Sequence, residues 1–162
     1  MSSPPPAVID IEASGFGRGS YPIEVGTVLE DGTSFCCLVR PEPEWRHWDK
    51  TAEAVHGINR NILLERGLPV SEVAQKLNEV LGRRVVYSDG WGVDRSWLAL
   101  LFDCADPQQT FRLESIRALL DEEQAARWHD AKDVVTAELD LQRHRASADA
   151  LIVQRALVRV GV

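Results

Sequence analysis

The sequence predicts a mixed α/β domain in which strands come first and helices follow. Apolar residues alternate over much of the first forty positions, helical apolar spacing dominates the remainder, and one apolar run, RVVYS at 84–88, lies between helical segments. The 162 residues suit a single domain with its own core. We therefore expect one domain over residues 1–162, with residues 1–6 (MSSPPP) as an extended lead-in.

Three antiparallel strands are expected to open the fold. The first is AVIDI at 7–11, and the second and third are PIEVGTVLE at 22–30 and TSFCCLV at 33–39. Asp31 and Gly32 stand between the last two and tolerate positive φ, which predicts a hairpin turn. Two later strands are expected, at 84–88 and near 110–114.

The remaining segments predict helices with recognisable ends. Short helices are expected over 51–55 and 59–66, the second capped by Asn59 and closed by Gly67. Ser71 is expected to cap a helix that ends at Gly82. Further helices are expected over about 93–104, from 121 to about 138 and over 146–160, and the apolar residues expected to face inward from the first of these are Val93, Trp97, Leu98, Leu101 and Phe102.

Asp121 and Gln124 have the spacing of a capping box and mark the start of the helix that runs to about 138.

Composition is typical of a globular protein outside the membrane. Hydrophobic residues make up 44% and charged residues 27%. No stretch approaches the ~20 apolar residues of a membrane span, and the first residues do not resemble a secretion signal, so a cytoplasmic location is expected. Cys36, Cys37 and Cys104 are expected to be buried thiols, because neighbouring cysteines and an odd third one suit neither disulfides nor a zinc site.

The first chemical signal is the pair Asp10 and Glu12, two residues apart on the first expected strand. Side chains alternate along a strand, so both carboxylates point to one face. They repel each other and raise each other's pKa unless a cation lies between them. Taken alone, the pair also fits an edge strand with solvated acids.

Two further segments carry acidic residues at the starts of expected helices. HRASAD places His144 and Asp149 around the first turn of the last helix, and SDGWGVDRSWL contains Asp94, with Asp89 as a competing candidate. Each segment alone also fits an ordinary helix terminus, where acids interact favourably with the helix dipole.

Together and in this order, the three segments resemble the motifs of the DEDD superfamily of 3′-to-5′ exonucleases, in its histidine-containing branch. That branch includes RNase T, oligoribonuclease and polymerase proofreading subunits. The segments YPIEVG at 21–26 and AVHGI at 54–58 also match segments common in this family. The resemblance covers residues 7 to about 157.

The resemblance implies an RNase H-like fold, with a five-stranded mixed sheet flanked by helices and its first three strands antiparallel. It implies that four carboxylates, those of Asp10, Glu12, Asp94 and Asp149, hold two divalent cations, Mg²⁺ or Mn²⁺, and that His144 is the general base. The implied reaction is hydrolysis at the 3′ end of single-stranded DNA, RNA or short oligonucleotides, which releases nucleoside 5′-monophosphates. An alternative is a catalytically weak docking subunit, and the family also suggests a homodimer or association with a polymerase.

This chemistry agrees with the residue types. Mg²⁺ and Mn²⁺ prefer carboxylate oxygens, and two such ions clamp a phosphodiester during hydrolysis. Histidine has an ordinary pKa near 6.5 and can accept a proton at neutral pH. The net charge of −7 is unfavourable for gripping long nucleic acid but suits a site that holds only a few terminal nucleotides on its metals.

Substrate contacts are expected from the residues after Glu12. Backbone N–H groups of Ala13, Ser14 and Gly15 could serve the terminal nucleotide, and Phe16 could stack on its base or be an ordinary core aromatic. His56 of AVHGI either contacts the nucleotide, as the resemblance implies, or is a structural histidine at a helix end.

The chain departs from the family at positions near these groups. It has Ala13 where threonine is common, Gly90 where asparagine is common, and Val93 where an aromatic residue is common.

Among the tryptophans, Trp97 is expected in the core and Trp91 near the pocket, whereas Trp45 and Trp48 could form either a substrate wall or a packed loop.

Overall fold

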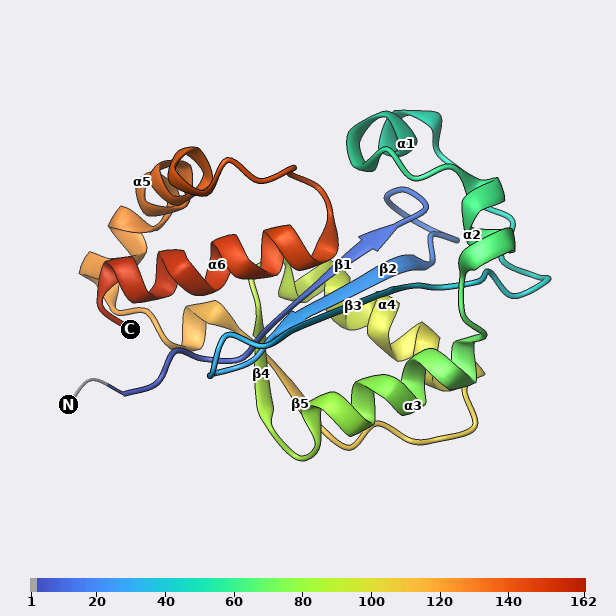
Figure 1. The fold of residues 1–162 in the computed structure, drawn as a ribbon, viewed down its shortest axis with the longest axis horizontal. Coiled ribbons are helices and arrows are strands. Elements are labelled where there is room, and N and C mark those ends of the chain that lie inside the picture. The colour runs from blue at the N-terminus through green and yellow to red at the C-terminus, as the bar shows by residue number, and fades with distance from the viewer. Residues whose placement is uncertain (1–2) are drawn as a thin grey trace.

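A computed structural model describes residues 3–162 as a five-stranded sheet covered by helices on both faces (Figure 1). The strand order is β3-β2-β1-β4-β5. The strands are β1 (Val8–Ala13), β2 (Pro22–Val28), β3 (Ser34–Leu38), β4 (Val85–Ser88) and β5 (Arg112–Ser115). The first three are antiparallel, whereas β4 is parallel to both β1 and β5. The predicted mixed sheet is confirmed, with β1 at its centre.

Six α-helices complete the fold, all within residues 3–162. They are α1 (Lys50–His56), α2 (Arg60–Arg66), α3 (Val70–Leu81), α4 (Trp91–Cys104), α5 (Glu122–Leu139) and α6 (Ala146–Val160), with a short 3₁₀ turn at Ile116–Ala118. Residues 3–7 of the chain precede β1 without helix or strand, and residues 1–2 of the predicted lead-in lie outside the described residues. No helix in the described residues combines the length and the apolar character needed to cross a membrane.

The sheet separates two hydrophobic clusters, and β1 contributes to both. Ile9, Ile11 and Ala13 belong to the cluster that includes the buried faces of α3 and α4. Val8 belongs to the other cluster, with α5 and α6. Since side chains alternate along a strand, Asp10 and Glu12 share the face of Val8 and lie toward α6. Figure 1 shows α5 and α6, in orange to red, on one side of the sheet.

Several local signals in the sequence have the structures predicted from them. The turn at Asp31 and Gly32 joins β2 to β3, with Gly32 at φ 86° and the Asp31 side chain accepting a hydrogen bond from the Thr33 N–H. Asn59 caps α2. Asp121 and Gln124 form the complete capping box of α5.

The predicted cap of α3 is wrong. The helix begins at Val70, two residues earlier than a Ser71 cap predicts, with Pro69 at the N-cap position and no side-chain cap. Ser71 lies within its first turn, where its hydroxyl accepts a hydrogen bond from the Asp106 N–H instead.

The expected inward position of Val93 is also wrong, although Trp97, Leu98 and Leu101 of the same helix are buried. α4 begins at Trp91, so Val93 lies in its first turn, where it is 46% exposed. Phe102 is partly buried against the core.

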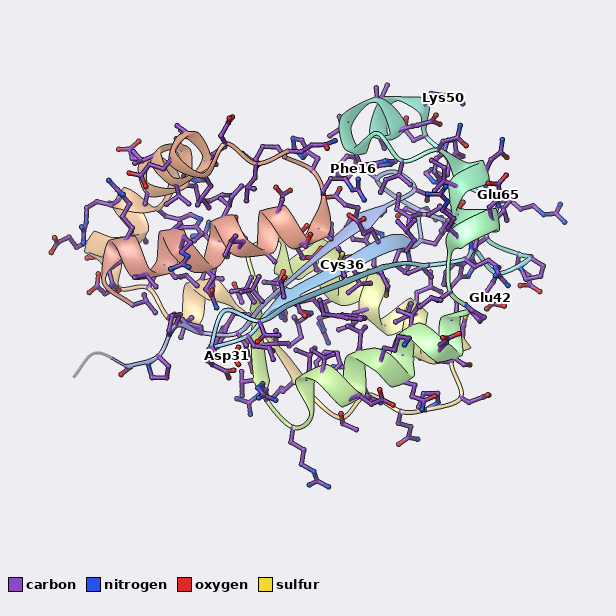
Figure 2. The ribbon with its side chains drawn as sticks, in the orientation of Figure 1. Phe16, Asp31, Cys36, Glu42, Lys50 and Glu65 are labelled. Atoms are coloured by element: carbon purple, nitrogen blue, oxygen red, sulfur yellow. The ribbon has the colours of Figure 1, made fainter. Side chains whose placement is uncertain are left out.

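The cysteines also differ from expectation. Cys36 and Cys104 are exposed, and Cys37 is partly buried. Cys36, labelled in Figure 2, lies on the edge strand β3, where it and Ser34 are exposed while Phe35, Cys37 and Leu38 are partly buried.

The first turn of α6 lies unusually close to β2. A Cβ atom on Gly26 would lie 2.3 Å from both the Ala146 carbonyl carbon and the Ser147 nitrogen. Only a residue without a side chain allows these two backbones to approach so closely. Gly26 therefore sets the distance between the sheet and the start of α6.

We expect Gly26→Ala to destabilise the protein by about 1–3 kcal/mol or more, because backbone rather than a flexible side chain must move to accept the methyl group. Gly92→Ala is the matched control, since its added Cβ meets nothing within 4 Å and its backbone is helical. Urea unfolding of both variants measures the difference. Equal stability of the two variants would contradict the close packing inferred at Gly26.

Candidate active site

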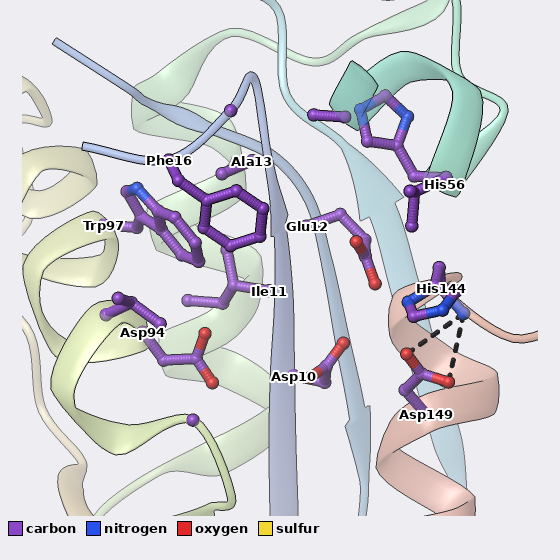
Figure 3. A pocket seen from close by; sticks show the side chains of 15 residues that line it. Asp10, Ile11, Glu12, Ala13, Phe16, His56, Asp94, Trp97, His144 and Asp149 are labelled. Atoms are coloured by element: carbon purple, nitrogen blue, oxygen red, sulfur yellow. Dashed lines mark hydrogen bonds between the residues drawn. The ribbon is translucent and has the colours of Figure 1, made fainter. Parts of the chain in front are cut away.

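A cavity of about 310 Å³ opens where the end of β1 meets α1, α4 and the start of α6. All four predicted carboxylates line it, together with His144. Asp10 and Glu12 come from β1, Asp94 from α4 and Asp149 from α6, so the cavity joins segments from both ends of the chain (Figure 3).

Three of the carboxylates form a compact group. Asp10, Glu12 and Asp149 each offer an oxygen atom, and these atoms all lie within 4.8 Å of one another. Asp94 lies on the other side of Asp10 in Figure 3. Its side chain is 3% exposed, and it accepts a hydrogen bond of 2.5 Å from the Ser88 hydroxyl. The competing candidate, Asp89, is paired with Lys132 and does not line the cavity.

Burial and mutual repulsion make the charged forms of the Asp10 and Glu12 carboxyl groups energetically unfavourable. Burial raises the pKa of Asp10 well above its ordinary value, and the charges of Asp94, Glu12 and Asp149 raise it further. Burial, followed by the charges of Asp149 and Glu24, raises the pKa of Glu12 to about 8.

Burial also raises the pKa of Asp94 to about 7, against the opposing effect of the Ser88 hydrogen bond. Without a cation, Asp10 and Glu12 thus favour the protonated form near neutral pH.

The donor set fits a divalent cation. Asp10 has a buried oxygen, Oδ2, that has no hydrogen-bond partner within residues 3–162. Such an oxygen costs free energy unless a proton or a cation meets it. Clustered carboxylate oxygens are also the ligands that Mg²⁺ and Mn²⁺ prefer. The residues therefore suit a hard divalent ion.

His144 and Asp149 are held together at the mouth of the cavity. The His144 backbone N–H donates to both carboxylate oxygens of Asp149, at 3.2 and 3.1 Å. Its φ is 60°, a left-handed conformation that is uncommon for histidine. The imidazole remains exposed. Arg143, which the sequence reasoning did not single out, donates from Nε to the same carboxylate at 3.1 Å.

Three of the expected nucleotide contacts after Glu12 line the cavity, and one does not. Ala13, Gly15 and Phe16 line it, and Phe16 is 75% exposed, which excludes the ordinary core aromatic. Figure 3 shows its ring beside Trp97. Ser14 lies outside the cavity, and its N–H already donates to the Tyr21 carbonyl at 2.9 Å. Its backbone N–H is therefore not free for a nucleotide.

His56 lines the cavity and has a defined protonation state. Its Nδ1 accepts a hydrogen bond from the Ile58 N–H at 3.0 Å, so the neutral ring carries its proton on Nε2. Burial lowers the pKa of His56, which favours that neutral form. Nε2 is buried and has no hydrogen-bond partner among the described residues. The ring thus combines a structural hydrogen bond with a free donor.

The cavity wall also contains apolar residues. Trp97 belongs to the core, as expected, and lines the cavity as well. Ala52, Val55 and Val93 line it too, although the sequence did not place them there. Trp91, expected near the pocket, does not line it and lies under the Arg95 guanidinium. The helical periodicity of α1 and α4 indicated their apolar faces but not which apolar residues would border a cavity.

Trp45 and Trp48 both belong to a packed loop. Trp45 is buried and stacks on Tyr21. Trp48 donates a hydrogen bond to Glu53 and lies edge-on to His56.

Several solved structures to which this chain is similar are exonucleases. The chain aligns with exonuclease I from Methylocaldum szegediense with a TM-score of 0.67 and 15% identity, over 95% of this chain and 39% of that one. For the zinc-bound complex of E. coli exonuclease I with single-stranded DNA, the values are 0.68, 12%, 95% and 39%. A full-length 3′-exonuclease aligns at 0.63 and 14%, over 98% of this chain and 82% of that one.

The chain therefore spans about two fifths of the length of the exonuclease I chains and most of the other. No protein-family model matches the sequence, and a search of curated proteins finds no match. At these identities the comparison establishes a shared fold, in agreement with the fold that the sequence motifs implied.

The raised pKa values predict an unusual pH dependence of stability in the presence of a chelator. The unfolded chain releases the Glu12 proton near its ordinary pKa of 4.5, whereas the folded state holds it to about pH 8. The contribution to stability is therefore present at low pH and is lost as the pH rises through about 8. Calorimetry should show a smaller fall in Tm with rising pH for the Asp10→Asn, Glu12→Gln double variant than for the wild type.

Mn²⁺ should reverse this loss and raise the wild-type Tm most at high pH, since it binds the folded carboxylates in place of protons. An identical pH profile for both proteins, or no effect of Mn²⁺ on the wild type, would contradict the proposed acidic cluster.

Proposed function

We propose that this protein is a metal-dependent 3′-5′ exonuclease. Its substrate would be the 3′ end of single-stranded DNA, RNA or a short oligonucleotide, and its product a nucleoside 5′-monophosphate. The observation that carries the proposal is the group of three carboxylates within 4.8 Å, with Asp94 beside it, in a cavity of a fold shared with 3′-exonucleases.

The four carboxylates are suited to hold the ions that this reaction requires. Bound by Asp10, Glu12, Asp94 and Asp149, two Mg²⁺ or Mn²⁺ ions would supply the positive charge that stabilises the scissile phosphate and would acidify the attacking water. Asp94 and Asp149 lie in the first turns of two different helices, so their carboxylates approach those of β1 from two sides.

We propose His144 as the general base. Its exposed imidazole lies at the mouth of the cavity, and its backbone is tied to Asp149. In the proposed reaction, the ring accepts the proton of the attacking water and later releases it to solvent. The exposed position favours that release.

The apolar part of the cavity suits a nucleobase. Phe16, Val55 and Val93 are all substantially exposed and line the same cavity. Exposed apolar side chains around a pocket mark a binding surface, and aromatic rings stack on bases of any sequence. This arrangement supports recognition of a terminal, unpaired nucleotide.

The negative charge of the protein supports a short binding site. With a formal charge of −7, it lacks the overall positive charge that favours binding of long nucleic acid. The E. coli exonuclease I complex contains single-stranded DNA, which supports the same class of substrate for this chain.

A timed digest tests the activity. Single-stranded DNA and RNA oligonucleotides, each labelled at the 5′ end, are incubated with Mn²⁺ and either the wild type or Asp10→Asn. We expect a ladder of products shortened from the 3′ end with the wild type and almost none with the variant, because the variant loses a carboxylate shared by the acidic cluster. Intact oligonucleotides with both proteins, or internal cuts alone, would contradict the proposal.

The general base is tested separately. His144→Ala should lower kcat by about 10² or more while leaving the Mn²⁺-induced rise in Tm nearly unchanged. His129→Ala, at an exposed position outside the cavity, is the control and should retain full activity. A wild-type kcat for His144→Ala would rule out its role as the base.

A further inference from the structure

Glu24 is a fifth carboxylate beside the cavity, and the proposed reaction gives it no role. It lies in the middle of β2 and is 2% exposed. In the antiparallel register of β1 and β2, it stands directly opposite Glu12. Its charge contributes to the raised pKa of Glu12. A buried carboxylate next to another acid is unfavourable unless specific partners hold it.

Glu24 has such partners at the start of α6. Arg145 donates from Nη2 to Oε2 at 2.6 Å and from Nε to both oxygens, at 3.1 and 3.2 Å. The Ala146 N–H donates to Oε1 at 2.7 Å. Two parallel guanidinium contacts together with a backbone N–H constrain both the distance and the orientation of the carboxylate.

This contact also replaces a missing cap. Arg145 is the N-cap residue of α6, but its side chain makes no capping hydrogen bond to the helix. The first N–H groups of a helix need an acceptor when they are buried. Glu24 supplies one from a strand that lies 122 residues earlier in the chain.

The residues held in this way border the two site groups of α6. His144 immediately precedes Arg145, and Asp149 lies in the first turn of the helix. The left-handed backbone of His144 is costly for a residue with a side chain and persists only where its neighbours constrain it. Gly26, two residues beyond Glu24 on β2, leaves the space in which the first turn of α6 rests.

We propose that Glu24 and Arg145 form a positioning pair that aligns His144 and Asp149 with the β1 carboxylates Asp10 and Glu12. The pair connects β2, which is fixed to β1 by the sheet, with the start of α6, whose first turn carries Asp149 and which His144 immediately precedes. The inference rests on the proposed function, because it assigns the pair to the same site. Neither residue touches the substrate, so both act through the groups that they position.

The alternative is that the pair only stabilises the packing of α6 against the sheet. Gln154 offers a matched control for this alternative. It is buried on the same helix, and its Nε2 donates to the carbonyls of Pro6 and Leu29, at 3.0 and 2.8 Å. It therefore also ties α6 to the region of β1 and β2, but more than one helical turn away from Asp149.

The experiment compares the variants Glu24→Gln, Arg145→Lys and Gln154→Met with the wild type, all at a temperature where each is folded. Three quantities are measured: the Mn²⁺ affinity by electron paramagnetic resonance of free Mn²⁺, the kcat and KM on a short oligonucleotide, and the imidazole NMR signals of the metal-free protein. The chain has four histidines, so comparison with His144→Ala assigns the His144 signal.

We expect Glu24→Gln to weaken Mn²⁺ binding and lower kcat by about tenfold or more, as residues that orient metal ligands do. KM should change little, and the His144 signal should shift. Arg145→Lys keeps the positive charge but loses the paired guanidinium contact. Its Mn²⁺ affinity and kcat should therefore fall less than those of Glu24→Gln. Gln154→Met should lower Tm while leaving Mn²⁺ affinity, kcat and the His144 signal close to those of the wild type.

The inference is overturned if Glu24→Gln and Gln154→Met lower Tm by similar amounts and both retain the Mn²⁺ affinity and the His144 signal of the wild type. A wild type that binds Mn²⁺ but cleaves no oligonucleotide would instead refute the proposed function. In that case, the Mn²⁺ affinity and the NMR signal of the variants still decide whether the pair positions the site.

Discussion

The repulsion among carboxylates at one end of the central strand is the constraint on which the rest of the structure depends. Asp10 and Glu12 share one face of β1, and Asp94 and Asp149 approach them from helices at two sides. Burial raises the pKa of Asp10, Glu12 and Asp94, and the charges of neighbouring cluster carboxylates raise the pKa of Asp10 and Glu12 further. A chain gains nothing for its own stability from such an arrangement. The surrounding elements must therefore hold it in place at a cost in folding free energy.

The fold holds these carboxylates in place by fixing β1 between two strands and two hydrophobic clusters. β1 lies between β2 and β4, and its alternate residues anchor in two hydrophobic clusters. On one side, the cluster that includes α3 and α4 supports the helix of Asp94. On the other, Gly26 and Glu24 of β2 bring the start of α6 against the sheet. The carboxylates thus belong to rigid elements, as a site that orients ions and a phosphate requires.

The sequence predicted the fold and the acidic groups because both depend on short-range patterns. Alternation along a strand predicts Asp10 and Glu12 on one face, and the resemblance to exonuclease motifs predicted that Asp94, His144 and Asp149 lie near them. The errors arise where tertiary neighbours decide. Val93 borders the cavity because no core residues pack over its side of the first turn of α4. The Ser14 N–H is not available to a nucleotide because it donates to the Tyr21 carbonyl. Glu24 was missed, although a charge within an apolar strand was a visible signal.

The central claim is that the three clustered carboxylates bind divalent metal, and anomalous X-ray diffraction tests it most directly. Crystals grown with Mn²⁺ would be measured at the manganese absorption edge, beside crystals of Asp10→Asn grown in the same way. The account predicts an anomalous peak in contact with Asp10, Glu12 and Asp149 in the wild type, and its loss or weakening in the variant. No peak among these carboxylates at a saturating Mn²⁺ concentration, or peaks only elsewhere on the protein, would contradict it.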